Sequence, residues 1–178
     1  VSYTLTVNQK SIALPTVADK TYTYTGKPQT LAITADDAYV TLDNAPHTDA
    51  DTYTVTASLT DAANTKWADG TTKAKTYAFS IAPATVTVTA LDQSAYVGDA
   101  APDLSAPELG KHYTVSGLIG EDALGGTLKL AYDPTPDMTK AGEAAIKVSG
   151  ATASANYTIV YADGTLTVAA RPASSGGS

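Results

Sequence analysis

The chain has 178 residues, a formal net charge of −7, a pI near 4.5 and no cysteine. Its eleven Lys and Arg residues are spread along the chain, which argues against a nucleic-acid partner because phosphate binding needs clustered basic side chains. Without cysteine there is neither a disulfide framework nor a thiolate metal site. No apolar run reaches the roughly 20 residues that span a bilayer, so we expect no membrane contact in this segment.

Apolar and polar residues alternate with a period of two along most of the chain, a pattern that predicts strands with one wet face. Thr is abundant, and the eleven Tyr residues far outnumber Phe and Trp; both Thr and Tyr suit a half-buried sheet. The sequence therefore predicts an all-β protein. In chain order the alternation is clearest at residues 2–7, 21–24, 31–33, 53–59, 76–81, 85–89, 157–161 and 165–168.

Helical signal is confined to residues 61–64 and 120–124, and each stretch is long enough for a single turn only. In the second, Glu121 and Asp122 would suit the positive end of a helix dipole, and Gly125 would stop the helix. We expect at most one short helix.

An alternating strand followed by a short linker recurs at residues 3–7, 77–81 and 166–168, as if the chain were cut from a tandem array. This predicts two small β domains in line, at residues 1–83 and 84–169, with residues 170–178 as a linker or tail. Residues 1–8 are either the first strand of domain one or the end of a preceding repeat.

The second domain carries spaced Tyr, Gly and Asn motifs that resemble the YGX-type MBG repeat of bacterial surface proteins. Two departures are Val97 between Tyr96 and Gly98, and Ala144 where the family usually has Tyr after Gly142. The motifs are Tyr96-Val97-Gly98-Asp99, Tyr113-Thr114-Val115-Ser116-Gly117-Leu118, Asn156-Tyr157-Thr158-Ile159 and Gly164-Thr165-Leu166-Thr167-Val168.

The first domain is similar to the Ig-like or MBG-like repeats of large adhesins, through Tyr24-Thr25-Gly26 with Gln29, Asp51-Thr52-Tyr53 and Trp67-Ala68-Asp69-Gly70-Thr71. Together the resemblances imply an Ig-like sandwich followed by a compact MBG or β-grasp-like domain. They further imply a non-catalytic stalk repeat of a surface adhesin, extracellular and cell-wall attached or secreted. Its partners would be neighbouring repeats of the same chain, and we expect a monomer without a cofactor.

Glycines and two Asp-Gly dipeptides predict the turns. Gly accepts a positive φ without penalty, and Asp-Gly is typical of tight hairpins. We expect turns at Gly26, Gly98 and Gly126, and hairpins at Asp69-Gly70 and Asp163-Gly164.

Reactive chemistry has little support in the sequence. His47 and His112 are too few for a zinc site, and we expect both in surface loops. Asp92 and Asp99 would be the first candidates for calcium at a domain junction, although no acidic ladder of a calcium loop is present. No Gly-x-Ser-x-Gly elbow exposes a nucleophile, so we expect no enzyme.

Trp67, Tyr22 and Tyr24 are the candidate ligand-binding residues, because aromatic rings offer a flat platform with a polar edge to a sugar. A core position for Trp67 is the competing interpretation. The expected function is a spacer that holds an adhesive region away from the cell. The alternatives are a module that binds host glycan or mucin, and an accessory domain of a secreted glycan-degrading enzyme.

Overall fold

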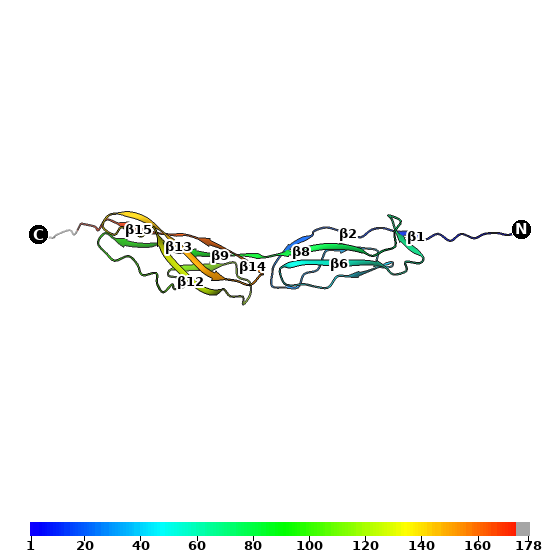
Figure 1. Cartoon of the computed structure of the whole chain (residues 1–178), viewed down its shortest axis with the longest axis horizontal. Helices are drawn as coiled ribbons and strands as arrows, with labels where there is room; N and C mark the ends of the chain where they lie inside the picture. The colour runs from blue at the N-terminus through cyan, green and yellow to red at the C-terminus, as the bar shows by residue number, and fades with distance from the viewer. Residues whose placement is uncertain (174–178) are drawn as a thin grey trace. The chain divides into compact units, whose positions relative to one another are not determined.

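The computed structural model describes residues 1–173, and all regular structure in that part of the chain is β (Figure 1). This confirms the predicted all-β class. The chain divides into two compact units, with the boundary between Pro83 and Ala84. The described residues contain no helix that is long and apolar enough to cross a membrane.

Unit 1 is built from eight strands. Four form the sheet β3-β8-β6-β5, while β1 pairs with β7 in parallel and β2 pairs with β4 in antiparallel. Inward-facing residues of β1, β5, β6 and β7 form the core, which includes Ile12, Val40 and Ala57. The strands are β1 (Lys10–Ile12), β2 (Thr16–Val17), β3 (Thr21–Thr23), β4 (Ile33–Thr34), β5 (Val40–Asp43), β6 (Asp51–Leu59), β7 (Thr65–Trp67) and β8 (Lys75–Ala82).

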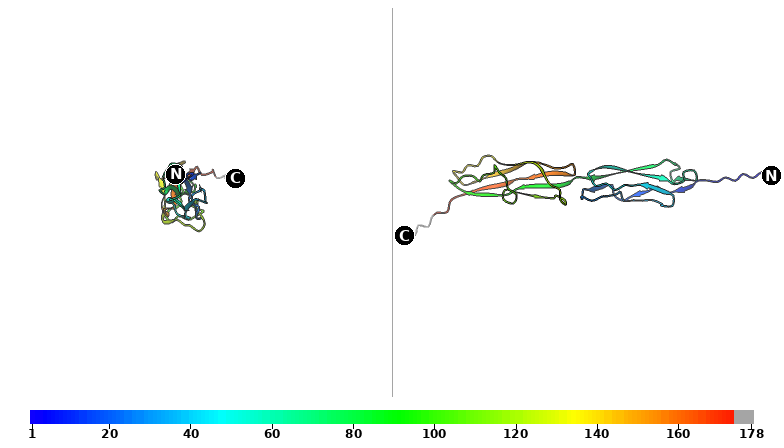
Figure 2. Two further views of the ribbon diagram at one scale, coloured as in Figure 1. Left: turned by 90° about the vertical axis from the view of Figure 1, so that its right-hand side faces the viewer. Right: turned by 90° about the horizontal axis from the view of Figure 1, so that it is seen from below.

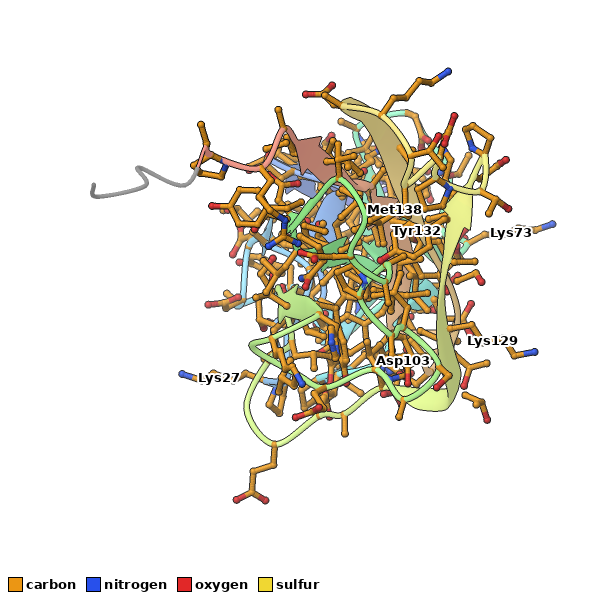
Figure 3. All side chains as sticks on the ribbon, turned by 90° about the vertical axis from the view of Figure 1, so that its left-hand side faces the viewer. Lys27, Lys73, Asp103, Lys129, Tyr132 and Met138 are labelled. Atoms are coloured by element: carbon orange, nitrogen blue, oxygen red, sulfur yellow. The ribbon has the colours of Figure 1, made fainter. Side chains whose placement is uncertain are left out.

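Unit 2 is built from seven strands in two sheets, ordered β10-β15-β13-β12 and β11-β9-β14. One core joins both sheets: Val88 comes from β9, Ile146 from β13 and Leu166 from β15. Tyr132 and Met138 pack against this core, whereas Lys129 extends into solvent (Figure 3). The strands are β9 (Ala84–Ala90), β10 (Gln93–Tyr96), β11 (Tyr113–Ser116), β12 (Gly125–Asp133), β13 (Gly142–Thr152), β14 (Tyr157–Ala162) and β15 (Gly164–Ala169).

The two units share one topology. The sheet β3-β8-β6-β5 has the same chain order and strand directions as β10-β15-β13-β12. The parallel pair of β1 with β7 corresponds to β9 with β14, and the antiparallel pair of β2 with β4 corresponds to β9 with β11. The chain therefore contains two copies of one strand arrangement.

In each unit the opening strands pair in parallel with the strands that close it. In unit 2, β9 pairs with β14 through six residue pairs, and β10 pairs with β15 through four. In unit 1, β1 pairs with β7 and β3 pairs with β8, through three residue pairs each. The chain consequently enters each unit at one end and leaves it at the other (Figures 1 and 2).

The alternating segment at residues 2–7 is not a strand in the structure, which corrects the prediction for that segment. Tyr3, Leu5 and Val7 are 91%, 88% and 80% exposed. A strand exists only where a neighbouring strand accepts its backbone hydrogen bonds. Residues 2–7 thus have the period-two pattern of a strand, but no strand of unit 1 pairs with them.

Neither predicted hairpin joins two paired strands. Asp69-Gly70 forms a tight turn in which the Gly70 N–H donates to the Trp67 carbonyl at 2.8 Å, but β7 and β8 on its two sides pair with other strands. Asp163-Gly164 is no hairpin: β14 ends at Ala162, β15 begins at Gly164, and the extended chain passes from one sheet to the other. A Cβ at Gly164 would lie 2.7 Å from the Ala90 carbonyl oxygen, so this glycine serves a close approach of backbones instead of a turn.

The short helix allowed at residues 120–124 is absent from the described structure. Gly120 and Glu121 lie in a turn, with the Asp122 N–H donating to the Ile119 carbonyl at 3.1 Å. The β-grasp alternative depended on that helix and loses its support. The other stretch, residues 61–64, is the single turn expected, and the Thr65 N–H donates to the Asp61 carbonyl at 2.9 Å.

The predicted tail, residues 170–178, is described as far as residue 173 and contains no strand there. Residues 174–178 lie outside the described residues. Arg171 forms an ion pair with Asp99 and lies over the Tyr96 ring, 5.7 Å from its centroid. The first residues after β15 thus fold back onto their own unit.

Candidate functional site

Trp67, the first candidate for ligand binding, lies at the end of β7 and is fully buried. Its indole N–H donates to the Lys73 carbonyl at 2.8 Å, across the turn centred on Gly70. The ring packs against Ile12 and Leu59 in the core of unit 1. Its position matches the core interpretation, because both faces and the polar edge of the indole have partners inside the protein.

Tyr22 lies on β3, an edge strand of the four-stranded sheet of unit 1, and Tyr24 lies just beyond it. Tyr24 is buried, whereas Tyr22 is half-buried, packs edge-on against Phe79 and accepts a hydrogen bond from the Ala32 N–H at 3.0 Å. Neither tyrosine belongs to the core cluster that holds Trp67. Because Trp67 is enclosed in that core and Tyr24 is buried, the three rings do not form one exposed platform for a sugar.

A second aromatic group was not predicted from the sequence. The His47 ring stacks on Tyr53 with a centroid separation of 3.7 Å, and both rings lie near Phe79. Backbone hydrogen bonds in both directions between His47 and Gln29 hold the histidine there. This stack covers one face of Tyr53 and leaves the histidine half-buried.

His112 is buried, which corrects its predicted place in an exposed loop. Its Nδ1 accepts a hydrogen bond from the Glu108 N–H at 3.0 Å, and the backbone N–H of His112 donates to the Glu108 carbonyl at 2.9 Å. The imidazole therefore closes the turn before β11. Its burial follows from this turn, whose hydrogen bonds with Glu108 the sequence pattern did not reveal.

The two acidic candidates for calcium hold parts of unit 2 together. Asp92 accepts a hydrogen bond from the Thr165 N–H at 2.8 Å. The contact lies where the chain passes from one sheet to the other, between β9 and β10 and between β14 and β15. Asp99 accepts one from the Tyr96 N–H at 3.2 Å and forms the ion pair with Arg171. Among the described residues, no group of three His, Cys, Asp or Glu side chains could hold a metal ion.

Tyrosine hydroxyls attach loops to strands in both units, a role that the sequence pattern did not reveal. The Tyr157 hydroxyl donates to the Asp122 carboxylate at 2.6 Å and accepts from the Ile119 N–H at 2.9 Å. The Tyr132 hydroxyl donates to the Pro102 carbonyl at 2.8 Å. Burial, and next the hydrogen bond to Asp122, raise the pKa of Tyr157 above its ordinary value.

Unit 2 has a groove of about 360 Å³ between β11 and β12, the edge strands of its two sheets. Half-buried apolar residues line it, among them Val115, Leu124 and Leu128. The volume suits a small molecule. However, the lining has no charged side chain, and its polar side chains are Tyr113 and Thr127.

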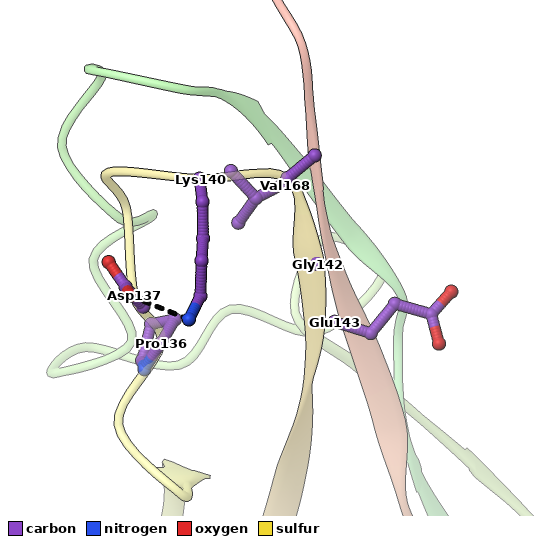
Figure 4. Close-up of a pocket in the computed structure, with 7 residues that line it drawn as sticks. Pro136, Asp137, Lys140, Gly142, Glu143 and Val168 are labelled. Carbon is purple, nitrogen blue, oxygen red and sulfur yellow. Dashed lines mark ion pairs between the residues drawn. The ribbon is translucent and has the colours of Figure 1, made fainter.

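A smaller hollow of about 80 Å³ lies beside the start of β13, between Gly142, Val168 and the loop before them (Figure 4). Lys140 and Asp137 cross its mouth as an ion pair at 3.3 Å. This space holds a few water molecules at most. Its polar groups are already paired with each other, so it offers little to a ligand.

These features define a class of protein: a pair of small all-β units in which aromatic, acidic and histidine side chains serve packing and loop attachment. A comparison with family models matches residues 86–167 to the MBG domain (YGX type). Unit 2 is an MBG domain of this type, which confirms the resemblance seen in its Tyr, Gly and Asn motifs. No curated protein matches the chain.

MBG domains are non-catalytic, repeat-type domains found in bacterial surface proteins, and they typically occur in surface or secreted proteins. The match lies within unit 2 and covers most of its strands, from β9 into β15. Unit 1 lies outside it, but repeats its strand order and directions.

Proposed function

We propose that this chain is a structural spacer of a bacterial surface adhesin, exported to the cell surface, where its units carry tension between a distal adhesive region and the cell. The parallel pairing between the opening and closing strands of each unit supports this role. A force applied through the chain pulls β9 at its first residue, Ala84, and β15 at its last, Ala169.

Such a force acts in shear: it pulls the two strands of each parallel pair along each other in opposite directions. In unit 2 the β9–β14 and β10–β15 pairs lie between the two points of attachment, and all their hydrogen bonds are loaded together. Both closing strands, β8 and β15, are also interior strands with a second, antiparallel neighbour. A unit of this design resists extension because no single bond can break first.

The junction between the units supports the same role. β8 ends at Ala82 and β9 begins at Ala84, so Pro83 alone separates them. Proline fixes its own φ, which narrows the range of angles through which such a linker can bend. Reach then comes from the number of folded units in the chain, as in other repeat proteins.

Single-molecule force spectroscopy tests the proposal. The chain contains no cysteine, so cysteines introduced in pairs give unique handles. Pulling through the two ends of unit 2 should require a higher unfolding force than pulling through Lys129→Cys and Ser149→Cys. These two residues are exposed and lie opposite each other in the antiparallel β12–β13 pair, which opens one bond at a time.

Equal forces in the two geometries would contradict the spacer role. A binding role would appear in a different measurement, the titration of the chain against mucin and a glycan array. Saturable binding there would replace the spacer by a recognition module. An accessory role in a glycan-degrading enzyme requires a catalytic domain in the parent protein, which its gene would reveal.

A further inference from the structure

We propose that residues 2–7 are the closing strand of a further β domain with the topology of units 1 and 2, whose other strands precede them in the parent protein. The proposal concerns the fold and does not depend on the mechanical role. It starts from the finding that this segment has the pattern of a strand and belongs to no sheet of the described structure.

The segment matches the closing strands of both units in sequence. Thr4-Leu5-Thr6-Val7 is identical to Thr165-Leu166-Thr167-Val168 of β15. It also aligns with β8, where Tyr77, Phe79 and Ile81 stand in the order of Tyr3, Leu5 and Val7. In a chain with two copies of one topology, a third copy of its closing sequence indicates a third copy of its closing strand.

The three copies of this sequence differ in how far their apolar side chains are buried. Phe79 and Ile81 are each 2% exposed, and Leu166 and Val168 are 0% and 3% exposed. Leu5 and Val7, at the corresponding positions, are almost fully exposed. Burial of apolar side chains of this size stabilises a fold because it removes their surface from water, so the pattern fits a strand that is packed in the intact protein.

The spacing to the next domain is also conserved within the chain. From Ile81, the last core residue of β8, to Ala84, the first residue of β9, is three residues. From Val7 to Lys10, the first residue of β1, is likewise three. A closing strand at residues 2–7 would therefore join unit 1 in the way that β8 joins unit 2.

The position of a closing strand explains why residues 2–7 do not pair with unit 1. β8 lies between β3 and β6, and β15 lies between β10 and β13. Each needs one parallel and one antiparallel neighbour of its own unit. The strand β3, the parallel neighbour in unit 1, is already paired with β8, so the missing neighbours must come from another domain.

Amide hydrogen exchange tests this on two proteins: the present chain, and the same chain extended N-terminally by the length of one unit of its parent. The amides of residues 2–7 should exchange as in an unfolded peptide in the present chain, and at least about 100-fold more slowly in the extended one. Unprotected amides in the extended chain would overturn the proposal, as would a parent sequence without strands in that stretch.

A variant gives an independent measurement. Leu5→Asp should leave the unfolding of units 1 and 2 unchanged in both proteins, and should abolish or strongly lower the additional transition of the extended one. Leu5→Ala, a milder change, should lower the same transition by a smaller amount. The matched control is Leu109→Asp, at a leucine 66% exposed in a loop of unit 2. An effect of Leu5→Asp on unit 1 would assign the segment to that unit instead.

Discussion

The hydroxyl of Tyr157, a buried residue on β14, lies 2.6 Å from Oδ2 of Asp122, and the same hydroxyl accepts the Ile119 N–H. One phenol oxygen thereby attaches the turn at residues 119–122 to the strand. Residues 120–122 are exposed, so the turn gains little from burial and depends on such a link.

Tyr157→Phe should loosen that turn without disturbing the sheets. The change keeps the ring but leaves the Ile119 N–H without its acceptor, so we expect the midpoint of thermal unfolding of unit 2 to fall by about 5 °C. Hydrogen exchange at Ile119 and Asp122 should rise more than exchange in β14. Tyr96→Phe, at an exposed tyrosine of the same unit, is the control and should have no effect. A fall of the same size in both variants would mean that the hydroxyl of Tyr157 makes no specific contribution.

Trp67→Ala should destabilise unit 1 by about 3–5 kcal/mol, because it leaves a cavity in the core and removes the donor to the Lys73 carbonyl. Trp67→Phe should cost less, since most of the ring remains. Chemical denaturation followed by circular dichroism measures both. Leu14→Ala, at a residue 39% exposed, is the control and should stay within about 0.5 kcal/mol of the parent. Wild-type stability in Trp67→Ala would show that the indole is dispensable for folding and would reopen its role in binding.

Gly164 and Gly142 form a matched pair of glycines, because each begins a strand and neither has a positive φ. They differ in the space around them: a Cβ at Gly164 would lie 2.7 Å from the Ala90 carbonyl oxygen, and a Cβ at Gly142 would meet nothing within 4 Å. Gly164→Ala should therefore destabilise unit 2 by about 1–3 kcal/mol through overpacking. Gly142→Ala should be neutral, or stabilising by up to about 1 kcal/mol. The same result for both alanines, measured by urea denaturation, would show that the strand crossing tolerates a side chain.

Acid should weaken unit 1 through Asp69. The hydrogen bond from Lys75 at 2.6 Å and those from Thr71 lower the pKa of this carboxyl from 3.8 to about 2. Since the folded-state pKa lies below the unfolded one, the carboxylate stabilises the fold above about pH 4, and this contribution is lost as the pH falls towards 2.

In Asp69→Asn, the thermal midpoint of unit 1 should consequently depend less on pH between 5 and 2. The exposed Asp37 makes none of these contacts, so Asp37→Asn should leave the slope as in the parent. Identical slopes in all three proteins would rule out Asp69 as a source of acid sensitivity.

Local pattern was sufficient to predict the class of the fold and the family of unit 2. Period-two alternation depends on the two faces of each strand, and it located β6, β8, β9 and β15 because their inward residues are buried at every second position. The YGX-type resemblance rested on Gly, Tyr and Asn positions over a long stretch, and the family match covers that stretch.

Pairing between distant strands could not be predicted in the same way. Nothing in Asp163-Gly164 distinguishes a hairpin from a passage between sheets; the difference lies in the Ala90 carbonyl, more than 70 residues away in the chain. The burial of His112 and the loop contacts of Tyr132 and Tyr157 likewise depend on partners that only the folded chain brings near. The alternation at residues 2–7 has the pattern of a strand, but no strand of units 1 and 2 pairs with it, and whether a strand forms depends on such neighbours.

The interior position of the closing strand sets the order in which each unit folds during synthesis. Because β15 lies between β10 and β13, the larger sheet of unit 2 cannot be completed until residues 164–169 are available. The same holds for unit 1 and β8. A chain that emerges from a ribosome with its N-terminus first therefore keeps each unit open until its final residues appear, and each unit can complete its fold before the next one.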